Sequence, residues 1–249
     1  ILTEMDTKGR DFNDVLVEAQ EKGYAEADPT FDVEGIDAAH KLVILASIAF
    51  EMPLTLEGLY TDGITQLEPQ DVAYAKELGY AIKHLGIARQ TKQGVELRVH
   101  PTLVPQASMI AGVNDVANAV MVNADAVGTT LFCGPGAGAE PTASSVIADI
   151  VDIARLLSRD SMPAVPSLGF AELSDKPLVD INDVTTGYYL RMLADDKPGV
   201  LSQVTTILSN HGISIETMHQ SEPEESETTA EIVLITSQIQ ERELLTAVS

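Results

Sequence analysis

The chain has 249 residues and a formal net charge of −23, with 45% hydrophobic but only 4% aromatic residues. This charge argues against nucleic acid and anionic membranes as partners, because both attract basic surfaces. The single cysteine cannot form an intrachain disulfide, and no long uncharged apolar run is present, so we expect a cytoplasmic protein with an aliphatic core.

The N-terminal segment predicts two helices separated by glycine. A helical pattern runs from Ile1 to a break at Gly9, and a second helix starts at Asp11 or Asn13 and ends at Gly23. Because the first pattern begins without a start signal, we expect the chain to be a piece of a longer protein.

Two further helices are predicted before the first strands. An acidic loop, YAEADPTFDVEGID, leads into the apolar segment AAHKLVILASIAFE, which we expect to be a helix ended by Pro53. The next segment, QDVAYAKELGYAIKHLG, predicts an amphipathic helix from Gln70 with Gly86 at its C-terminal end.

Alternating segments then predict strands. IARQTKQGVELRVHPTLV has a turn at KQG, and NAVMVNADAVGTTLFCG follows it. Cys133 ends this apolar stretch, where a buried and inert thiol is the more frequent state. A glycine loop and a helix from near Pro141 to about Leu157 complete a mixed-sheet α+β pattern.

The C-terminal third of the sequence predicts a linker followed by a second, small domain. Residues 159–187 show no period and are rich in Pro, Gly and Ser. Residues 188–249 predict the order β-α-β-β-α, with Pro198 near the start of a helix, Gly212 just past its end, and a charged hairpin tip at EPEESET. This order is one strand short of a ferredoxin-like unit, so we expect an incomplete domain.

The acidic loop is the first candidate site. Its carboxylates are Glu26, Asp28, Asp32, Glu34 and Asp37. Asp37 and Lys41 are spaced to share a helix face, and Lys41 heads an apolar run, where partial burial would lower its pKa and suit it to proton transfer. The alternative is a solvated loop followed by an ordinary ion pair. The spacing does not fit a calcium loop.

The glycine loop is the second candidate. Gly134, Gly136 and Ala139 fit the spacing G-x-G-x-x-A of a dinucleotide fingerprint, but the following helix leads into SRDSMPAVPS and not into a strand. The loop is therefore not the first turn of a Rossmann domain. Gly136 and Gly138 would let a ligand or another domain approach the backbone closely, or they form a tight strand-to-helix turn. Neither Cys133 nor the histidines show metal-ligand spacing.

Three motifs together resemble the homoserine dehydrogenases. GYAEADPTFDVEGIDAAHK, ADAVGTT and GPGAGAEPTASSVIADI match that family in order and spacing over residues 1–158. LRMLADDKPGVLSQVTTILSNHGISIETMHQ resembles an ACT regulatory domain, here residues 188–249. The resemblance implies an α+β catalytic and dimerisation domain, a linker, and a ferredoxin-like ACT domain lacking its last strand.

The resemblance also implies a reaction and residue roles. The reaction is the NAD(P)H-dependent reduction of aspartate semialdehyde to homoserine, and its reverse, in amino-acid biosynthesis. Lys41 is similar to the family's acid/base, and Tyr24, Glu26 and Asp37 are similar to its substrate-binding residues. Gly136 and Gly138 would lie against NADP or NAD, held mainly by an N-terminal domain that this chain lacks. We therefore expect the 249-residue chain alone to be inactive.

The expected partners follow from the same resemblance. They are a small amino-acid substrate, threonine as an effector at the ACT domain, and further copies of the chain in a homodimer or homotetramer. The alternative interpretation is a non-enzymatic amino-acid sensor, in which an ACT module is joined to a dimerisation domain and the acidic loop is only solvated surface.

Overall fold

The computed structural model describes residues 1–136, 138–158, 170, 172–221 and 228–249. It divides into two units, which are described separately below. The first unit comprises Ile1–Ile87 and Val99–Lys176, and the second comprises Ala88–Arg98 and Pro177–Ser249. One β-hairpin therefore contributes residues to both units.

The N-terminal helices of the first unit form as their caps predict. Helix α1 (Leu2–Lys8) ends at Gly9, which is left-handed with φ 63°. Helix α2 (Phe12–Glu21) begins where the Asp11 side chain accepts a hydrogen bond from the Asn13 amide. This confirms the break at Gly9 and selects Asp11 over Asn13 as the capping residue.

The acidic loop contains a short helix and ends in a long one. Helix α3 (Thr30–Val33) precedes α4 (Ile36–Phe50), whose N-cap is Gly35 with φ 78°. This backbone conformation strains any residue with a Cβ, so glycine is needed here. The predicted apolar helix ending before Pro53 is confirmed.

The predicted helix from Gln70 to Gly86 is wrong in its second half. Helix α5 spans only Pro69–Glu77, and Gly79 then adopts φ 83°. Strand β2 (Tyr80–Gln90) follows and pairs with β3 (Val95–Pro105) around the expected turn. The apolar spacing continued past residue 77, but strand pairing provides hydrogen bonds that outweigh this weak helical signal.

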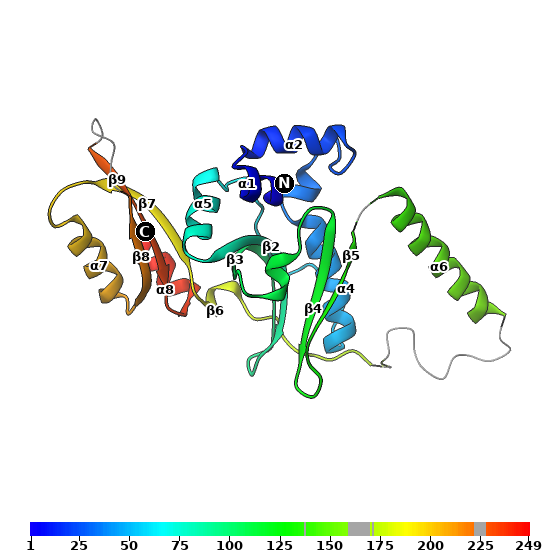
Figure 1. The fold of residues 1–249 in the computed structure, drawn as a ribbon. Coiled ribbons are helices and arrows are strands. Elements are labelled where there is room, and N and C mark those ends of the chain that lie inside the picture. Colours follow the sequence, from blue (N-terminus) through cyan, green and yellow to red (C-terminus); the bar gives the residue numbers. More distant parts are fainter. Residues whose placement is uncertain (137, 159–169, 171, 222–227) are drawn as a thin grey trace. The chain divides into compact units, whose positions relative to one another are not determined.

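The strands of the first unit form a three-stranded sheet and a separate hairpin (Figure 1). The sheet has the order β1-β3-β2, where β1 is Tyr60–Thr61. The hairpin pairs β4 (Ala117–Ala124) with β5 (Gly128–Pro135), and the 3-10 helix η1 (Met109–Gly112) precedes it. Cys133 on β5 is exposed, so the expectation of a buried thiol is wrong. No residue of β4 or β5 is buried, so this hairpin has no interior in which to bury the thiol.

The core of the first unit lies between its N-terminal helices, α5 and β2. Its buried and partly buried apolar side chains are Ile1, Leu2, Met5, Phe12, Leu16, Val33, Ile64, Leu67, Val72 and Ile82. This packing fixes the loop that precedes α4 against the sheet, because Val33 and Ile64 belong to the same cluster.

Helix α6 spans Ala139–Leu157, so it begins two residues before Pro141. None of its residues is buried, and apolar side chains such as Ile147 and Ile150 are 60% exposed. Of the predicted linker, residues 159–169 and 171 lie outside the described residues. None of the described helices is long and apolar enough to cross a membrane.

The second unit confirms the predicted β-α-β-β-α order. Its main elements are β7 (Tyr189–Asp195), α7 (Val200–Asn210), β8 (Ile215–Gln220), β9 (Thr229–Thr236) and α8 (Glu241–Val248). The antiparallel sheet has the order β7-β9-β8. The 3-10 helix η2 (Ile181–Asp183) and the β6–β10 pair (Thr185–Thr186, Ile239–Gln240) come before and after these strands. Of the expected tip EPEESET, residues 222–227 lie outside the described part of the chain.

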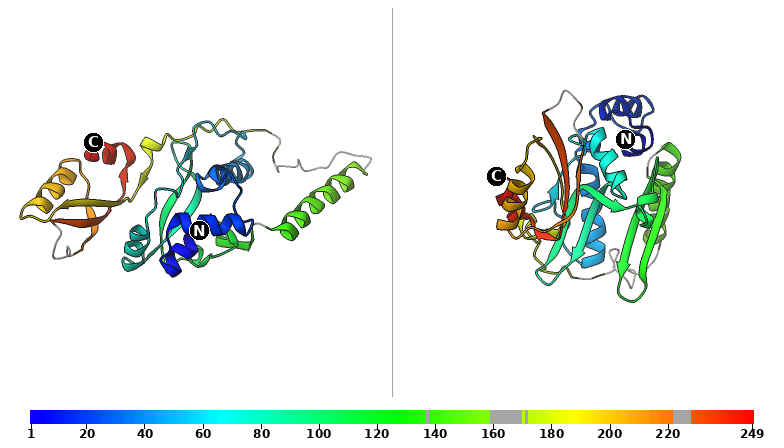
Figure 2. Two further views of the ribbon diagram at one scale, coloured as in Figure 1. Left: turned by 90° about the horizontal axis from the view of Figure 1, so that it is seen from above. Right: turned by 60° about the vertical axis from the view of Figure 1, so that its left-hand side comes forward.

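Both helices of the second unit cover the same face of its sheet, as the two views in Figure 2 show. The buried residues of this core are Leu208, Ile213, Ile232, Leu234 and Leu244. Leu208 belongs to α7, Leu244 belongs to α8, and Ile232 and Leu234 alternate along β9. This is the sheet-and-helix layering expected of a ferredoxin-like unit without its last strand.

Candidate functional site

The turn before α4 is fixed by the segment that follows β1. The Ile64 amide donates to the Val33 carbonyl at 2.9 Å, and the Thr65 hydroxyl donates to Glu34 Oε1 at 2.9 Å. A Cβ on Gly63 would lie 2.7 Å from the Val33 carbonyl oxygen, so the two segments can approach this closely only with glycine there. The start of α4 is therefore held by tertiary contacts as well as by Gly35.

Asp37 and Lys41 form an ion pair on the first turns of α4. Lys41 Nζ lies 2.5 Å from Asp37 Oδ2, which confirms that the two side chains share a helix face. The expected partial burial of Lys41 is wrong, since its side chain is 60% exposed. The reason is that α4 has two apolar faces: one is buried, while the face that continues from Lys41 through Ile44 and Ile48 is exposed.

Three carboxylates of the acidic loop are used to shape the loop itself. Asp28 accepts hydrogen bonds from the Thr30 hydroxyl at 2.7 Å and the Thr30 amide at 3.1 Å, and these bonds lower the pKa of Asp28. Asp32 accepts from the Glu26 amide at 3.2 Å. With Glu34 bonded to Thr65, these contacts order the loop and leave the Glu26 side chain exposed to solvent.

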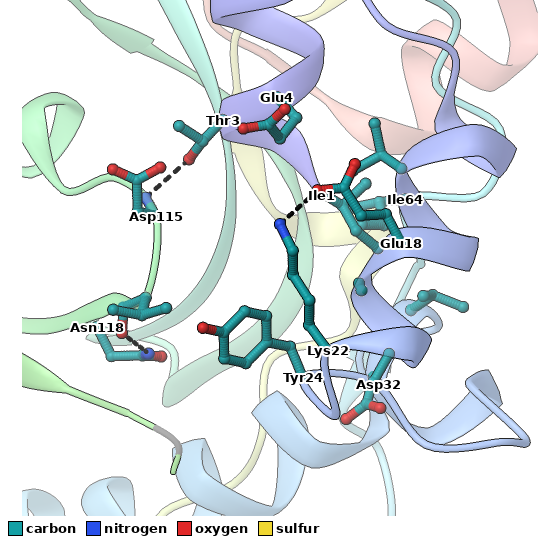
Figure 3. Close-up of a pocket in the computed structure, with 15 residues that line it drawn as sticks. Ile1, Thr3, Glu4, Glu18, Lys22, Tyr24, Asp32, Ile64, Asp115 and Asn118 are labelled. Atoms are coloured by element: carbon teal, nitrogen blue, oxygen red, sulfur yellow. Dashed lines mark hydrogen bonds and ion pairs between the residues drawn. The ribbon is translucent and has the colours of Figure 1, made fainter.

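A cavity of about 330 Å³ opens beside this loop (Figure 3). Residues from α1, α2, the acidic loop and the start of β4 line it. They are Ile1, Thr3, Glu4, Val15, Glu18, Ala19, Lys22, Tyr24, Ala25, Asp32, Val33, Ile64, Asp115, Val116 and Asn118. Figure 3 shows the Tyr24 hydroxyl pointing toward the side that carries Asn118, while Lys22 extends to the Glu18 carboxylate. Four carboxylates against one lysine make the wall predominantly acidic, which suits a ligand bearing an ammonium group.

The cavity's charges are linked in a network around Glu18. Its carboxylate accepts hydrogen bonds from Lys22 and from Arg10, and Arg10 also contacts Glu4 at 3.2 Å. The hydrogen bond from Lys22, followed by that from Arg10, lowers the pKa of Glu18 to about 2. One wall of the cavity is therefore charged and pre-ordered.

The Glu18 network predicts a defined acid dependence. Because the folded-state pKa of about 2 lies below the ordinary value of 4.5, the carboxylate stabilises the fold above the ordinary value. This contribution is lost as the pH falls toward the folded value. We expect the stability difference between wild type and Glu18→Gln to shrink toward zero in urea titrations over that range. Carbon NMR of Glu18 should show its pKa rising in Arg10→Gln, and an unchanged pKa in that variant would contradict the network.

The glycine loop uses one of its glycines within the hairpin. A Cβ on Gly136 would lie 1.8 Å from the Asn118 side-chain nitrogen, so this side chain occupies the space beside Gly136. Gly138 is the N-cap of α6 with φ 121°, and no side chain caps that helix. The role of both glycines at a cofactor stays a prediction. Asn118 also lines the cavity, so one residue borders both the cavity and Gly136.

The structure groups the predicted residues in two places. Tyr24 lines the cavity with Asp32, while Asp37 and Lys41 pair on α4. Glu26 lies in the intervening loop and is not among the cavity residues. The opposite wall, at Asp115 and Asn118, was not found from the sequence. No cluster of three or more metal-ligating side chains occurs among the described residues.

Comparison with known proteins gives consistent matches over the whole chain. A model of the family described as homoserine dehydrogenase matches residues 1–151, and a model of the ACT domain matches residues 188–249. The chain is 57% identical to the homoserine dehydrogenase of Pseudomonas aeruginosa, over 100% of this chain and 58% of that protein. It is 49% identical to that of Neisseria gonorrhoeae, again over 100% of this chain and 58% of that protein.

A solved structure agrees with these matches. The crystal structure of a homoserine dehydrogenase from Thiobacillus denitrificans is similar with a TM-score of 0.91 and 53% identity, over 99% of this chain and 56% of that one. The chain thus spans a little over half the length of the relatives it matches.

Proposed function

This chain belongs to the homoserine dehydrogenase family, and we propose that it forms the substrate-binding, catalytic and regulatory part of an enzyme that interconverts aspartate semialdehyde and homoserine. The proposal concerns the whole protein, since the chain spans 58% of its relative from Pseudomonas aeruginosa. The observation that carries it is the exposed Asp37–Lys41 pair at the start of α4.

The Asp37–Lys41 pair suits the proton step of this reaction. When an aldehyde is reduced, its oxygen becomes a hydroxyl and requires a proton donor. The Lys41 ammonium can supply that proton, and Asp37, at 2.5 Å, fixes the direction of Nζ. In the reverse direction the same amine takes the proton back. The exposure of Lys41 leaves its Nζ accessible to a substrate.

The acidic loop suits the other end of the substrate. Aspartate semialdehyde carries an α-ammonium group, and the acidic loop offers it the exposed Glu26 carboxylate and the Asp32 carboxylate, which also accepts a hydrogen bond from the Glu26 amide. The Tyr24 hydroxyl faces the cavity that Asp32 also lines, and it can donate or accept a hydrogen bond (Figure 3). We assign the amino-acid head group to Tyr24, Glu26 and Asp32, with the aldehyde toward Lys41.

The glycine loop fits a nicotinamide cofactor only in part. The uncapped N-terminus of α6 at Gly138 presents free amides, which favour an anion, but Glu140 in the first turn opposes one. Asn118 occupies the space at Gly136. We therefore propose that this chain binds the cofactor only through backbone contacts at Gly136 and Gly138. NADP or NAD, when bound, supplies the hydride, and we assign its main binding site to residues beyond this chain.

The second unit suits regulation by an amino acid. Its residues 188–249 match the ACT domain. The N-cap of α7 is Gly199, with φ 97° and no side-chain cap, so amides at this helix start are open to a carboxylate. We propose L-threonine as the effector, and a homodimer or homotetramer as the assembly.

The function is tested by assaying the full-length gene product. We expect oxidation of NADPH or NADH that depends on aspartate semialdehyde, with homoserine as the product identified by mass spectrometry. Loss of the reduced cofactor without homoserine would contradict the assignment. The alternative, a non-enzymatic amino-acid sensor, predicts binding of threonine by calorimetry with no turnover of the aldehyde.

A further inference from the structure

We propose that α4, the helix carrying Asp37 and Lys41, is held at both ends by segments that continue into the second unit, and that ligand binding by that unit acts on Lys41 through these segments. The proposal rests on the proposed function for the role of Lys41 and of the effector. It adds a physical route, which is argued from contacts inside each unit.

The β2–β3 hairpin holds the N-terminal half of α4. A Cβ on Gly35 would lie 2.9 Å from the His84 ring on β2 and 3.0 Å from Val99 Cγ1 on β3. About two turns further along α4, a Cβ on Gly86 would lie 3.3 Å from Leu42, the residue after Lys41. These close contacts leave little space for α4 to move independently of the two strands.

Hydrogen bonds reinforce this end. His84 Nε2 lies 2.9 Å from the Asp62 carbonyl oxygen, and the Asp62 amide donates to the Val99 carbonyl at 2.8 Å. Both strands are thereby tied to the segment that fixes the turn before α4. Burial lowers the pKa of His84, against the opposing effects of Asp62 and Glu34, so the ring is kept neutral in this packed position.

A second segment holds the C-terminal end of α4. The Ser174 amide donates to the Glu51 carbonyl at 2.6 Å, and its hydroxyl donates to the Phe50 carbonyl at 3.1 Å. Lys176 Nζ also donates to the Phe50 carbonyl at 3.4 Å. The last carbonyls of a helix lack partners within the helix and favour a cation, so these contacts cap α4 from outside.

Both holding segments continue into the second unit and meet there. The hairpin enters it at Ala88–Arg98, and the other segment enters it at Pro177. The Val95 amide donates to the Pro177 carbonyl at 2.9 Å, and the Val179 amide donates to the Val95 carbonyl at 2.9 Å. A Cβ on Gly94 would lie 2.2 Å from the Pro177 oxygen, so the junction depends on glycine.

Buried charges stiffen this junction. Glu96 accepts two hydrogen bonds from Arg89, at 2.7 and 3.1 Å, and one from Arg98 at 2.8 Å. The side chains of Glu96 and Arg98 are only 5% and 8% exposed, so breaking one partner leaves an uncompensated buried charge. Rearranging the junction would separate these charges, so we expect it to resist deformation.

The segment that leaves the junction is connected to α8. Beyond Val179, the Glu241 amide at the start of α8 donates to the Val184 carbonyl at 3.1 Å, and Arg242 pairs with Asp183. A ligand that shifts α8 thus displaces residues 179–184, the segment that is hydrogen-bonded to Val95. Regulation of this kind requires that the ligand binds the two arrangements unequally.

The coupling is tested first without any ligand, in the 249-residue chain. Hydrogen exchange followed by mass spectrometry is compared for wild type, Glu96→Gln in the second unit, and the matched control Arg191→Gln. Arg191 also pairs with a strand glutamate, Glu231, at 3.1 Å, but it belongs to β7 and to neither of the segments that meet at the junction. We expect Glu96→Gln to accelerate exchange in residues 36–50 roughly fivefold or more, and the control to leave them within about twofold.

Exchange that changes only in residues 88–98 and 177–249 would overturn the proposal. Circular dichroism checks the fold of each variant. If Glu96→Gln does not fold, Arg89→Gln replaces it, because Arg89 is 53% exposed and its loss leaves the Glu96–Arg98 pair intact.

The second test uses the full-length protein with L-threonine. We expect Glu96→Gln to raise the half-inhibiting concentration roughly fivefold or more, or to lower maximal inhibition, while calorimetric threonine affinity changes less. An active, inhibited wild type with an equally inhibited Glu96→Gln variant overturns the coupling. A wild type without dehydrogenase activity overturns the proposed function instead, and the exchange experiment then decides the coupling alone.

Discussion

Lys41→Ala in the full-length protein is expected to lower kcat by about 10²–10⁴-fold, the range for removal of a general acid or base. KM should change little, since the amino-acid head group is assigned to Tyr24, Glu26 and Asp32. Stability should also change little, because an exposed helix ion pair contributes about 0.3–0.5 kcal/mol. Steady-state kinetics with aspartate semialdehyde and urea unfolding measure the two effects separately.

Lys8→Ala provides a matched control. Lys8 is also 60% exposed and also forms an i,i+4 ion pair, with Glu4 at 2.8 Å, but it belongs to α1 and not to α4. We expect its kcat to stay within about twofold of wild type, because an exposed pair of this kind has little effect on the fold. If Lys41→Ala behaved like Lys8→Ala, the catalytic role of Lys41 would be refuted and the sensor interpretation favoured.

The parts of the fold that the sequence predicted best are those determined by local signals. Gly9 and Asp11 define the ends of α1 and α2, because a left-handed glycine and a side-chain cap act within one helix turn. The Asp37–Lys41 pair is also local, since spacing alone puts both residues on one helix face. The family motifs added the roles of these residues, which spacing alone does not define.

The errors arose where distant residues decide the structure. Residues 80–86 form a strand because β3 pairs with them, although their apolar spacing also fits a helix. Cys133 is exposed because its hairpin has two strands, which a sequence pattern does not reveal. The cavity wall at Asp115 and Asn118 is nearly a hundred residues from Tyr24, so no local motif joins them.

The exposure of Lys41 has the same origin. The segment after Lys41 is apolar on all sides, which suggested burial, yet α4 buries only the face that carries Leu42, Val43 and Ala46. Sequence periodicity could not separate the two faces because both are aliphatic. Contacts with the β2–β3 hairpin decide which one is buried.

Gly35→Ala is expected to lower the free energy of unfolding of the first unit by about 2–5 kcal/mol. A left-handed backbone at φ 78° costs an L-residue about 1–2 kcal/mol, and an added methyl in a packed site costs about 1–3 kcal/mol. The new Cβ would lie 2.9 Å from the His84 ring and 3.0 Å from Val99. Urea unfolding followed by circular dichroism measures the loss.

Gly9→Ala separates the two contributions. Gly9 is also left-handed, with φ 63°, but a Cβ there meets no atom within 4 Å, so only the backbone cost of about 1–2 kcal/mol should appear. The excess loss in Gly35→Ala then measures the contact with the hairpin, and a His84→Ala background should remove part of it in a double-mutant cycle. Equal losses at Gly35 and Gly9 would mean that the hairpin does not hold the start of α4. Because Lys41 lies on that helix, Gly35→Ala should also reduce kcat in the full-length protein, in proportion to the displacement of α4.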